Sequence, residues 1–240
     1  MALFVLSDTH LSFSDDKPMD VFGRRWQDYT YKLEKNWNSV VTDDDTVVIA
    51  GDISWAMSHM GAVKDFDFIN RLKGKKIIGK GNHDYWWTSL KKLGEMLDTF
   101  KYDTIRFLYN NAYYVDGYII AGSRGWYFDE NNRNAPENAD FDKIVAREVV
   151  RLELSLNEAE RLKSECAPDA EILVFLHFPP VYGGFECKPI TDVLKKHGIK
   201  RCYFGHIHAS YDVPRSIEHD GITYYITSAD YLEFTPLKIF

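Results

Sequence analysis

Residues 2–10 read Ala-Leu-Phe-Val-Leu-Ser-Asp-Thr-His, a short apolar run that leads into a carboxylate and an imidazole. The run predicts a buried β-strand over Ala2–Leu6, because it is short, continuous and ended by polar residues. Asp8 and His10 are two residues apart, so an extended backbone would point both side chains to the same side. The beginning of the chain therefore predicts a strand that presents a pair of metal-ligand side chains.

The same order of strand and polar motif recurs four more times along the chain. The later strands are expected at Thr46–Ala50, Lys76–Ile78, Ile172–Leu176 and Arg201–Phe204. The motifs that follow them are Gly51–Asp52, Gly81–Asn82–His83–Asp84, His177 and Gly205–His206–Ile207–His208. Side chains at the carboxyl ends of neighbouring strands converge on one crevice. Asp, Asn and His bind borderline divalent metals, and this set is large enough for two ions.

Helical periodicity lies between several of these strands. Three segments place apolar residues on one helix face: Trp26, Tyr29, Leu33, Trp37 and Val40; Met60, Val63, Phe66 and Ile69; and Phe141, Ile144, Val145, Val149, Leu152 and Leu156, in a helix that runs to about Ser164. We expect these faces to pack on a core. Alternating strands and helices predict an α/β fold, and 240 residues fit one domain over residues 1–240.

Two other segments argue against a purely parallel sheet. Strand-like runs at Tyr113–Val115 and Tyr118–Ala121 follow each other with no helix between them. Asp220–Gly221 lies between two further strand-like runs within residues 216–226, which predicts a hairpin. We therefore expect mixed sheets.

Composition narrows the classes of function. A net charge of −7 and a pI near 5.6 argue against an extended nucleic-acid surface, which needs a positive face. Cys166, Cys187 and Cys202 are an odd count without paired spacing, which is typical of reduced thiols. The sequence shows neither a signal-peptide pattern nor an apolar run long enough to span a bilayer, so we expect a cytoplasmic location.

Taken in order, the five motifs resemble the signature of the calcineurin-like metallophosphoesterases, and the resemblance extends from Asp8 to His208. It implies a four-layer sandwich of two mixed β-sheets flanked by α-helices. It also implies two metal ions, either manganese, iron or zinc. Such a site would hydrolyse a phosphodiester or phosphomonoester of a small molecule or nucleotide by attack of a metal-bridging hydroxide.

The resemblance also implies a role for each motif residue. Asp52 would bridge the two ions. The other ligands would divide into two sets: Asp8, His10 and His208 for the first ion, and Asn82, His177 and His206 for the second. His83 would be the general acid, and Asp84 would accept a hydrogen bond from its imidazole and keep it protonated. Simple structural explanations compete, namely a helix N-cap at Asp8 or Asp84, a turn at Gly51–Asp52 and a core histidine at position 177.

Further residues suggest contacts with a substrate. Arg124 lies between glycines in the loop Gly122–Ser123–Arg124–Gly125, where it could bind a phosphate or be an ordinary surface arginine. Aromatic residues are dense around the motifs and could either line a leaving-group site or pack behind it: Trp55, Tyr85, Trp86, Trp87, Trp126, Tyr127, Phe178 and Tyr182. The polar stretch Phe128–Asn138 predicts an exposed loop, which could lie at the rim of the site.

Several functional readings remain open. Ile53–Ser54–Trp55 stands where the protein serine/threonine phosphatases carry Asp-Arg-Gly, which disfavours that branch and favours small phosphodiesters or nucleotides. A nuclease of the same superfamily and a non-catalytic scaffold with the same fold are the alternatives. A lipid phosphodiester substrate would need an exposed apolar or basic flap, which the sequence does not locate. The sequence leaves the oligomeric state and the identity of the metal undecided.

Overall fold

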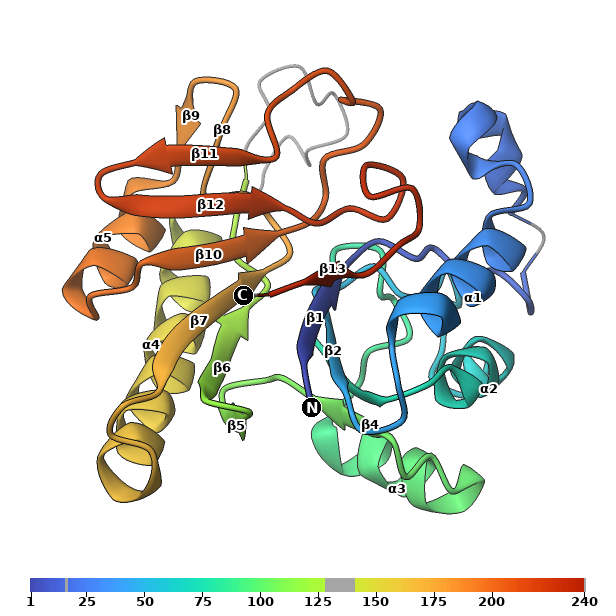
Figure 1. Cartoon of the computed structure of the whole chain (residues 1–240), viewed down its shortest axis with the longest axis horizontal. Coiled ribbons are helices and arrows are strands. Elements are labelled where there is room, and N and C mark those ends of the chain that lie inside the picture. The colour runs from blue at the N-terminus through green and yellow to red at the C-terminus, as the bar shows by residue number, and fades with distance from the viewer. Residues whose placement is uncertain (16, 128–140, 240) are drawn as a thin grey trace.

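The computed structural model describes residues 1–15, 17–127 and 141–239. Within these residues two β-sheets face each other, and each sheet carries helices on its outer face (Figure 1). This arrangement confirms the predicted four-layer sandwich. The loop predicted at residues 128–138 lies outside the described residues.

The first sheet has the strand order β13-β1-β2-β3-β4. Four of its strands are parallel: β1 (Leu3–Leu6), β2 (Thr46–Ile49), β3 (Lys75–Ile78) and β4 (Ile105–Phe107). Strand β13 (Leu237–Lys238) pairs antiparallel with β1 at the edge. Helices on this side of the molecule are α1 (Tyr29–Val40), α2 (Val63–Arg71) and α3 (Leu90–Phe100), and two 3-10 turns, η1 (Met19–Phe22) and η2 (Arg24–Trp26), precede α1.

The second sheet has the order β11-β12-β10-β7-β6-β5. Its four central strands are parallel: β6 (Tyr118–Ser123), β7 (Glu171–Leu176), β10 (Arg201–Phe204) and β12 (Ile222–Ile226). The edge strands β5 (Tyr113–Val115) and β11 (Ser216–His219) are antiparallel to their neighbours. Helices α4 (Phe141–Cys166) and α5 (Lys188–Lys196) lie on its outer face, and β8 (Val181–Tyr182) and β9 (Phe185–Glu186) form a small hairpin.

Alternation along the strands divides the core into layers. In β1, Leu3 and Val5 belong to the apolar cluster between the sheets, whereas Phe4 and Leu6 belong to the cluster formed with α1–α3. All four side chains are buried, which explains why the strand reads as a continuous apolar run. The predicted strands are thus confirmed, with ends that differ by at most two residues.

The helix predictions hold for three segments but need correction at their ends. Trp26 belongs to η2 rather than to α1, and Met60 precedes α2 with a side chain that is 55% exposed. Asp84 is no helix N-cap, because the next helix begins at Leu90 and Ser89 caps it by accepting from the amide of Lys92. The chain between them turns so that Trp86 can enter the core.

The predicted hairpin near the carboxyl end is confirmed. Strands β11 and β12 pair antiparallel around Asp220 and Gly221, whose φ angles are +50° and +76°. Two successive residues with positive φ match the turn type whose twist suits a two-residue hairpin loop.

The structure tests two expectations from composition, the lack of a membrane-spanning helix and the unpaired cysteines, but not the cellular location. In the described ranges no helix combines the length and apolar character that crossing a bilayer requires. Cys166, Cys187 and Cys202 are unpaired, as the odd count predicts. The cytoplasmic location stays a prediction.

Candidate metal centre

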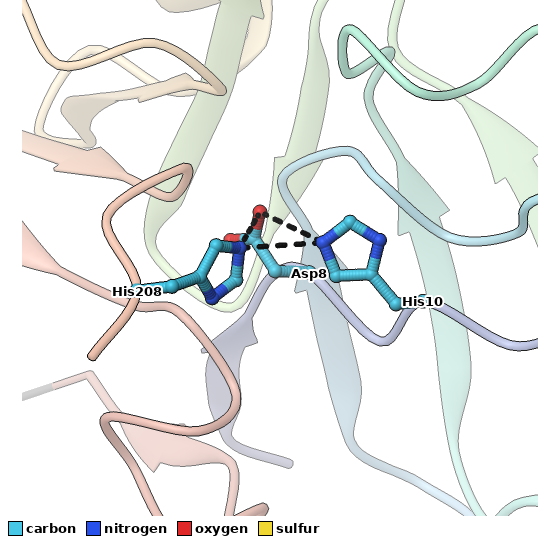
Figure 2. A group of neighbouring side chains, drawn as sticks. All are labelled: Asp8, His10 and His208. Atoms are coloured by element: carbon cyan, nitrogen blue, oxygen red, sulfur yellow. Dashed lines mark hydrogen bonds and ion pairs between the residues drawn. The ribbon is translucent and has the colours of Figure 1, made fainter. Parts of the chain in front are cut away.

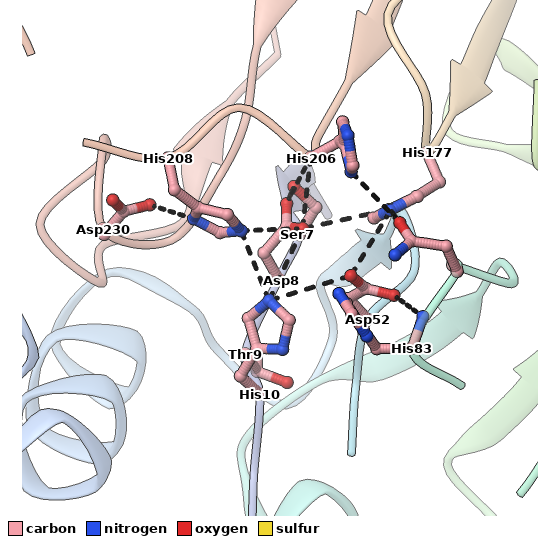
Figure 3. A network of polar contacts seen from close by, with 12 residues as sticks. Ser7, Asp8, Thr9, His10, Asp52, His83, His177, His206, His208 and Asp230 are labelled. Atoms are coloured by element: carbon pink, nitrogen blue, oxygen red, sulfur yellow. Dashed lines mark hydrogen bonds and ion pairs between the residues drawn. The ribbon is translucent and has the colours of Figure 1, made fainter. Parts of the chain in front are cut away.

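The seven predicted metal ligands meet at the edge where the two sheets present the carboxyl ends of their parallel strands (Figure 3). Strands β1, β2 and β3 of the first sheet lead into Asp8, His10, Asp52 and Asn82. Strands β7 and β10 of the second sheet lead into His177, His206 and His208. Segments almost 200 residues apart, such as Asp8 and His206, are therefore neighbours, with an amide-to-carboxylate distance of 3.0 Å.

A first group of ligand atoms comes from Asp8, His10 and His208 (Figure 2). The Nε2 atoms of the two histidines are 3.3 Å apart. They lie 4.0 Å (His10) and 3.5 Å (His208) from Oδ1 of Asp8. The sequence predicted the same three residues for one ion, and the structure brings them together.

A second group comes from Asp8, Asp52 and His177. Nε2 of His177 lies 3.4 Å from Oδ2 of Asp52 and 2.6 Å from Oδ1 of Asn82, which is also 3.1 Å from Nδ1 of His206. Oδ2 of Asp52 is 3.7 Å from Nε2 of His10, a member of the first group. Asp52 thus belongs to the second group and also approaches the first, as a bridging ligand would have to do.

Four of the candidate ligand residues have a left-handed backbone conformation, which sets the direction of their side chains. The φ angles of Asp8, His10, Asp52 and His206 are +61°, +44°, +54° and +69°. The expectation that an extended backbone aligns Asp8 with His10 is therefore wrong, because the strand ends at Leu6 and both residues turn back toward the second sheet. Asp and His tolerate this region better than most residues, and each such residue still costs about 1–3 kcal/mol. Four of them in one site indicate that the fold holds the loops in place.

Two glycines of the motifs cannot be replaced by a larger residue, because a neighbouring ligand loop lies too close to them for a side chain. A Cβ atom on Gly81 would collide with Oδ1 and the backbone nitrogen of Asp52. A Cβ atom on Gly205 would collide with Oδ2 of Asp8 and Oγ of Ser7. In both cases the absent side chain lets one ligand loop lie directly against another.

The buried carboxylates of the site would be stabilised by a bound cation. Asp8 and Asp52 are buried, and burial together with the neighbouring Asp84 and Asp8 raises the pKa of Asp52 well above its ordinary value. Burial also lowers the pKa of His10, and that of His177 to about 3, so these imidazoles are neutral at physiological pH. Buried carboxylates beside neutral imidazole nitrogens form a donor set that fits divalent metal ions.

Protonation of His208 offsets part of this negative charge, beside the hydrogen bonds that Asp8 accepts from Ser7 and from the amide of His206. Burial opposes its protonation, but hydrogen bonds to Asp230 and Asp8 raise its pKa to about 10. Because its Nε2 points into the first ligand group, a cation bound there would displace that proton. Metal binding is then coupled to proton release.

Asp230 is a site residue that the sequence analysis missed. Its buried carboxylate accepts a hydrogen bond from Nδ1 of His208 at 2.8 Å, from the amide of Ala209 at 3.1 Å and from the hydroxyl of Tyr211 at 3.0 Å. Such a carboxylate fixes the tautomer and the orientation of a metal-binding imidazole. It follows β12 within Thr227–Ser228–Ala229–Asp230, so the rule of polar residues after a strand could have found it.

Replacing Asp230 with asparagine is expected to weaken metal binding by about 10- to 100-fold, the usual effect of losing such a carboxylate. The variant should be measured by titration of manganese or zinc against a competing chelator. Asp212→Asn, at an exposed position of the loop between β10 and β11 that also carries His208, is the matched control. Equal metal affinities of the Asp230→Asn variant and the parent protein would refute the orienting role.

The predicted hydrogen bond between Asp84 and His83 is wrong. The carboxylate of Asp84 accepts from the backbone amides of Gly81, Asp52 and Ile53 and from Nε1 of Trp86, at 2.7–2.9 Å. Among the described residues Nδ1 of His83 has no partner, and burial lowers its pKa. Asp84 faces the two loops beneath the site, whereas the His83 ring lines the pocket above it. A catalytic role of His83 stays a prediction.

Arg124 is held by an ion pair. Its Nη2 lies 3.4 Å from Oε1 of the buried Glu148, and its side chain is 25% exposed. It is not among the residues that line the pocket, so its contact with a phosphate stays a prediction. Of the predicted aromatic wall, Trp55 lines the pocket, whereas Trp86 is buried against Phe66 in the core.

With this fold and site in place, comparison with known proteins identifies the class: residues 1–210 match the family described as calcineurin-like phosphoesterase, and the chain belongs to that family. The family's members typically bind two metal ions, in keeping with the two ligand groups. A curated relative is an uncharacterised protein of Methanocaldococcus jannaschii, 28% identical over 131 residues that span 50% of this chain and 67% of the relative.

Solved structures share the fold. A protein of unknown function from Aquifex aeolicus aligns over 99% of this chain and 95% of its own length, with a TM-score of 0.50 and 16% identity. The protein TT1561 of Thermus thermophilus aligns over 95% of this chain and 89% of its own length, with a TM-score of 0.59 and 13% identity. At these identities the likeness extends to the fold alone.

Proposed function

We propose that this protein is a metal-dependent phosphoesterase that hydrolyses a small phosphodiester or phosphomonoester with two ions, either manganese, iron or zinc. The observation that carries the proposal is the convergence of two ligand groups beneath one pocket: the groups share Asp8, and Asp52 of the second group lies 3.7 Å from His10 of the first. Bound there, two such ions lower the pKa of a water molecule toward neutrality and offset the charge of the phosphoryl oxygens. Family membership supports the same chemistry.

The chain's own residues would orient the ester and handle the proton. The amide of His83 donates to Oδ1 of Asp52 at 2.8 Å, so the position of this histidine is tied to a metal ligand. The His83 ring faces the pocket, where it is placed to protonate the oxygen of the leaving group. Arg124 is proposed to contact phosphoryl oxygens from the side of β6 and β7.

Metal-stripped protein should hydrolyse neither bis-p-nitrophenyl phosphate nor p-nitrophenyl phosphate, and addition of manganese, iron or zinc should restore turnover. The ratio of diester to monoester hydrolysis then assigns the substrate class. Metal-stripped protein that receives the same buffer without any metal is the control. Two bound ions per chain without turnover of either ester would count against the esterase and favour the scaffold reading, and cleavage of DNA alone would favour the nuclease.

Replacing His83 with alanine is expected to slow esters with poor leaving groups far more than nitrophenyl esters. A general acid contributes about 10²- to 10⁴-fold, but a leaving group as stable as p-nitrophenolate needs no proton. The measurement compares kcat for phenyl and p-nitrophenyl esters in the variant and in the parent protein. A uniform loss across both esters would show that His83 does not deliver the proton.

A further inference from the structure

The pocket above the ligand groups has two chemically distinct halves. Its volume is about 260 Å³, and among the residues that the structure describes its polar lining consists of residues already assigned to the site: His10, Asp52, His83, His206 and His208. The other lining residues are all apolar: Met19, Phe22, Trp26, Trp55 and Ala209. A pocket for a sugar or another hydroxyl-rich group would present additional hydrogen-bonding side chains beside the phosphate.

The apolar half of the pocket is a wall of packed side chains, formed by Met19, Phe22, Trp26 and Trp55, that contacts the candidate metal ligands. Met19 and Trp26 are 5% and 3% exposed, although they lie in the short turns η1 and η2. Nε1 of Trp55 donates to Sδ of Met19 at 3.2 Å, which joins the loop after β2 to η1. The Trp26 ring lies 5.8 Å from the rings of both His10 and His208. A group bound against this wall would therefore sit beside the reacting phosphorus.

Phe22 extends the wall to the mouth of the pocket. Its side chain is 61% exposed, and that of its neighbour Val21 is 70% exposed. Large apolar side chains exposed beside a pocket commonly mark the path of an apolar ligand. Phe22 is free to cover such a ligand, because the folded protein does not bury it.

We propose, on the basis of the phosphoesterase function above, that the preferred substrate is a phosphate ester with an apolar alkyl or aryl group close to phosphorus. That group would bind between Met19, Phe22, Trp26 and Trp55. At about 30 Å³ for each water-sized group, the pocket holds the phosphoryl group and a substituent of a few carbon atoms. A longer chain would leave the pocket past Phe22.

The experiment uses alkylphosphonates, which have no ester bond to hydrolyse, and measures their dissociation constants by calorimetry with the manganese-loaded protein. Methyl-, propyl- and hexylphosphonate should bind with rising affinity, by about fourfold for each methylene group that leaves water. The heat-capacity change should become more negative along the series. Equal affinity for methyl- and hexylphosphonate would overturn the proposal.

Phe22→Ala tests the location of the apolar group. It should remove part of the gain in affinity between methylphosphonate and hexylphosphonate. Phe13→Ala is the matched control, because Phe13 lies in the same connection between β1 and α1, is 42% exposed and packs on Phe68 outside the pocket. Retention of the full gain in Phe22→Ala would overturn this placement. Methylphosphonate binding without a chain-length effect refutes only this inference, whereas failure of every phosphonate to bind with any metal refutes the phosphoesterase function as well.

Discussion

The Asp52→Asn variant is expected to lose metal-dependent hydrolysis by about 100-fold or more, since even an outer-shell partner of a metal contributes up to that factor. The same substitution should stabilise the protein when no metal is bound. Asp52 is 1% exposed and lies beside Asp84 and Asp8, and this crowding raises its pKa well above the ordinary value. Its charge is therefore unfavourable in the folded protein unless a cation is present.

Asparagine fits the contacts that Asp52 makes without a metal. Its side-chain oxygen can still accept from the amide of His83, as Oδ1 of Asp52 does at 2.8 Å. Its amide nitrogen would replace Oδ2, which lies 3.4 Å and 3.7 Å from Nε2 of His177 and His10. Those imidazoles are neutral, so replacing the carboxylate with an uncharged amide removes no ion pair with them.

The measurement is thermal unfolding in the presence of a chelator, set against turnover with manganese restored. The melting temperature of metal-free Asp52→Asn should exceed that of the parent protein, by about 2–4 °C for each kcal/mol in a chain of this size. With metal added, the parent protein should have the higher melting temperature, because it binds the ions more tightly than Asp52→Asn does. Asp43→Asn, on an exposed turn, controls for the loss of one charge. Unchanged activity, or a lower melting temperature without metal, would contradict the account of Asp52.

Replacing Asp84 with alanine is expected to lower the free energy of unfolding by about 4 kcal/mol or more. The carboxylate accepts from three backbone amides and one indole nitrogen in a buried site, and each donor left without a partner costs about 1–3 kcal/mol. Burial raises the pKa of Asp84 to about 6, against the lowering effect of these hydrogen bonds, so the group is still ionised at neutral pH. Charge strengthens each of these bonds.

Chemical denaturation should show the lower free energy of unfolding of Asp84→Ala, and a metal titration should show a weaker metal affinity. The three amides belong to the loops that carry Asp52 and Asn82, so both loops lose their common anchor. Asp84→Asn keeps one acceptor oxygen and should be intermediate, which preserves a measurable protein if the alanine variant does not fold. Asp98→Ala, on the exposed face of α3, is the control. A loss below about 1 kcal/mol for Asp84→Ala would show that water replaces the carboxylate and that Asp84 is not structural.

Asp52 and Asp84 therefore differ in kind although they are neighbours in one site. Asp52 faces the ligand groups and is costly without a cation, whereas Asp84 faces the backbone and holds the loops together. The sequence analysis placed Asp84 with His83 because the two are adjacent in the motif. Adjacent residues after a strand can point in different directions, and here the His83 ring lines the pocket whereas the Asp84 carboxylate accepts from backbone amides.

By itself the sequence predicted most of the strands, the mixed α/β class and the convergence of the seven candidate ligands, but it did not predict β4, β8, β9 or β13. The predicted features follow from local patterns, since a short apolar run forms a buried strand and the polar residues after it must lie at the strand's end. The helices α3 and α5 were not predicted, although their apolar residues have helical spacing: Leu90, Leu93, Met96 and Leu97 in α3, and Ile190, Val193 and Leu194 in α5.

Only the tertiary structure decided how the site is supported. The left-handed backbone of Asp8 and His10, the orienting contact of Asp230 on His208 and the apolar wall of Met19, Phe22 and Trp26 all depend on packing between segments far apart in the chain. A local pattern records which residue types follow a strand, but the direction of a side chain is set by the neighbours that the whole fold brings against it.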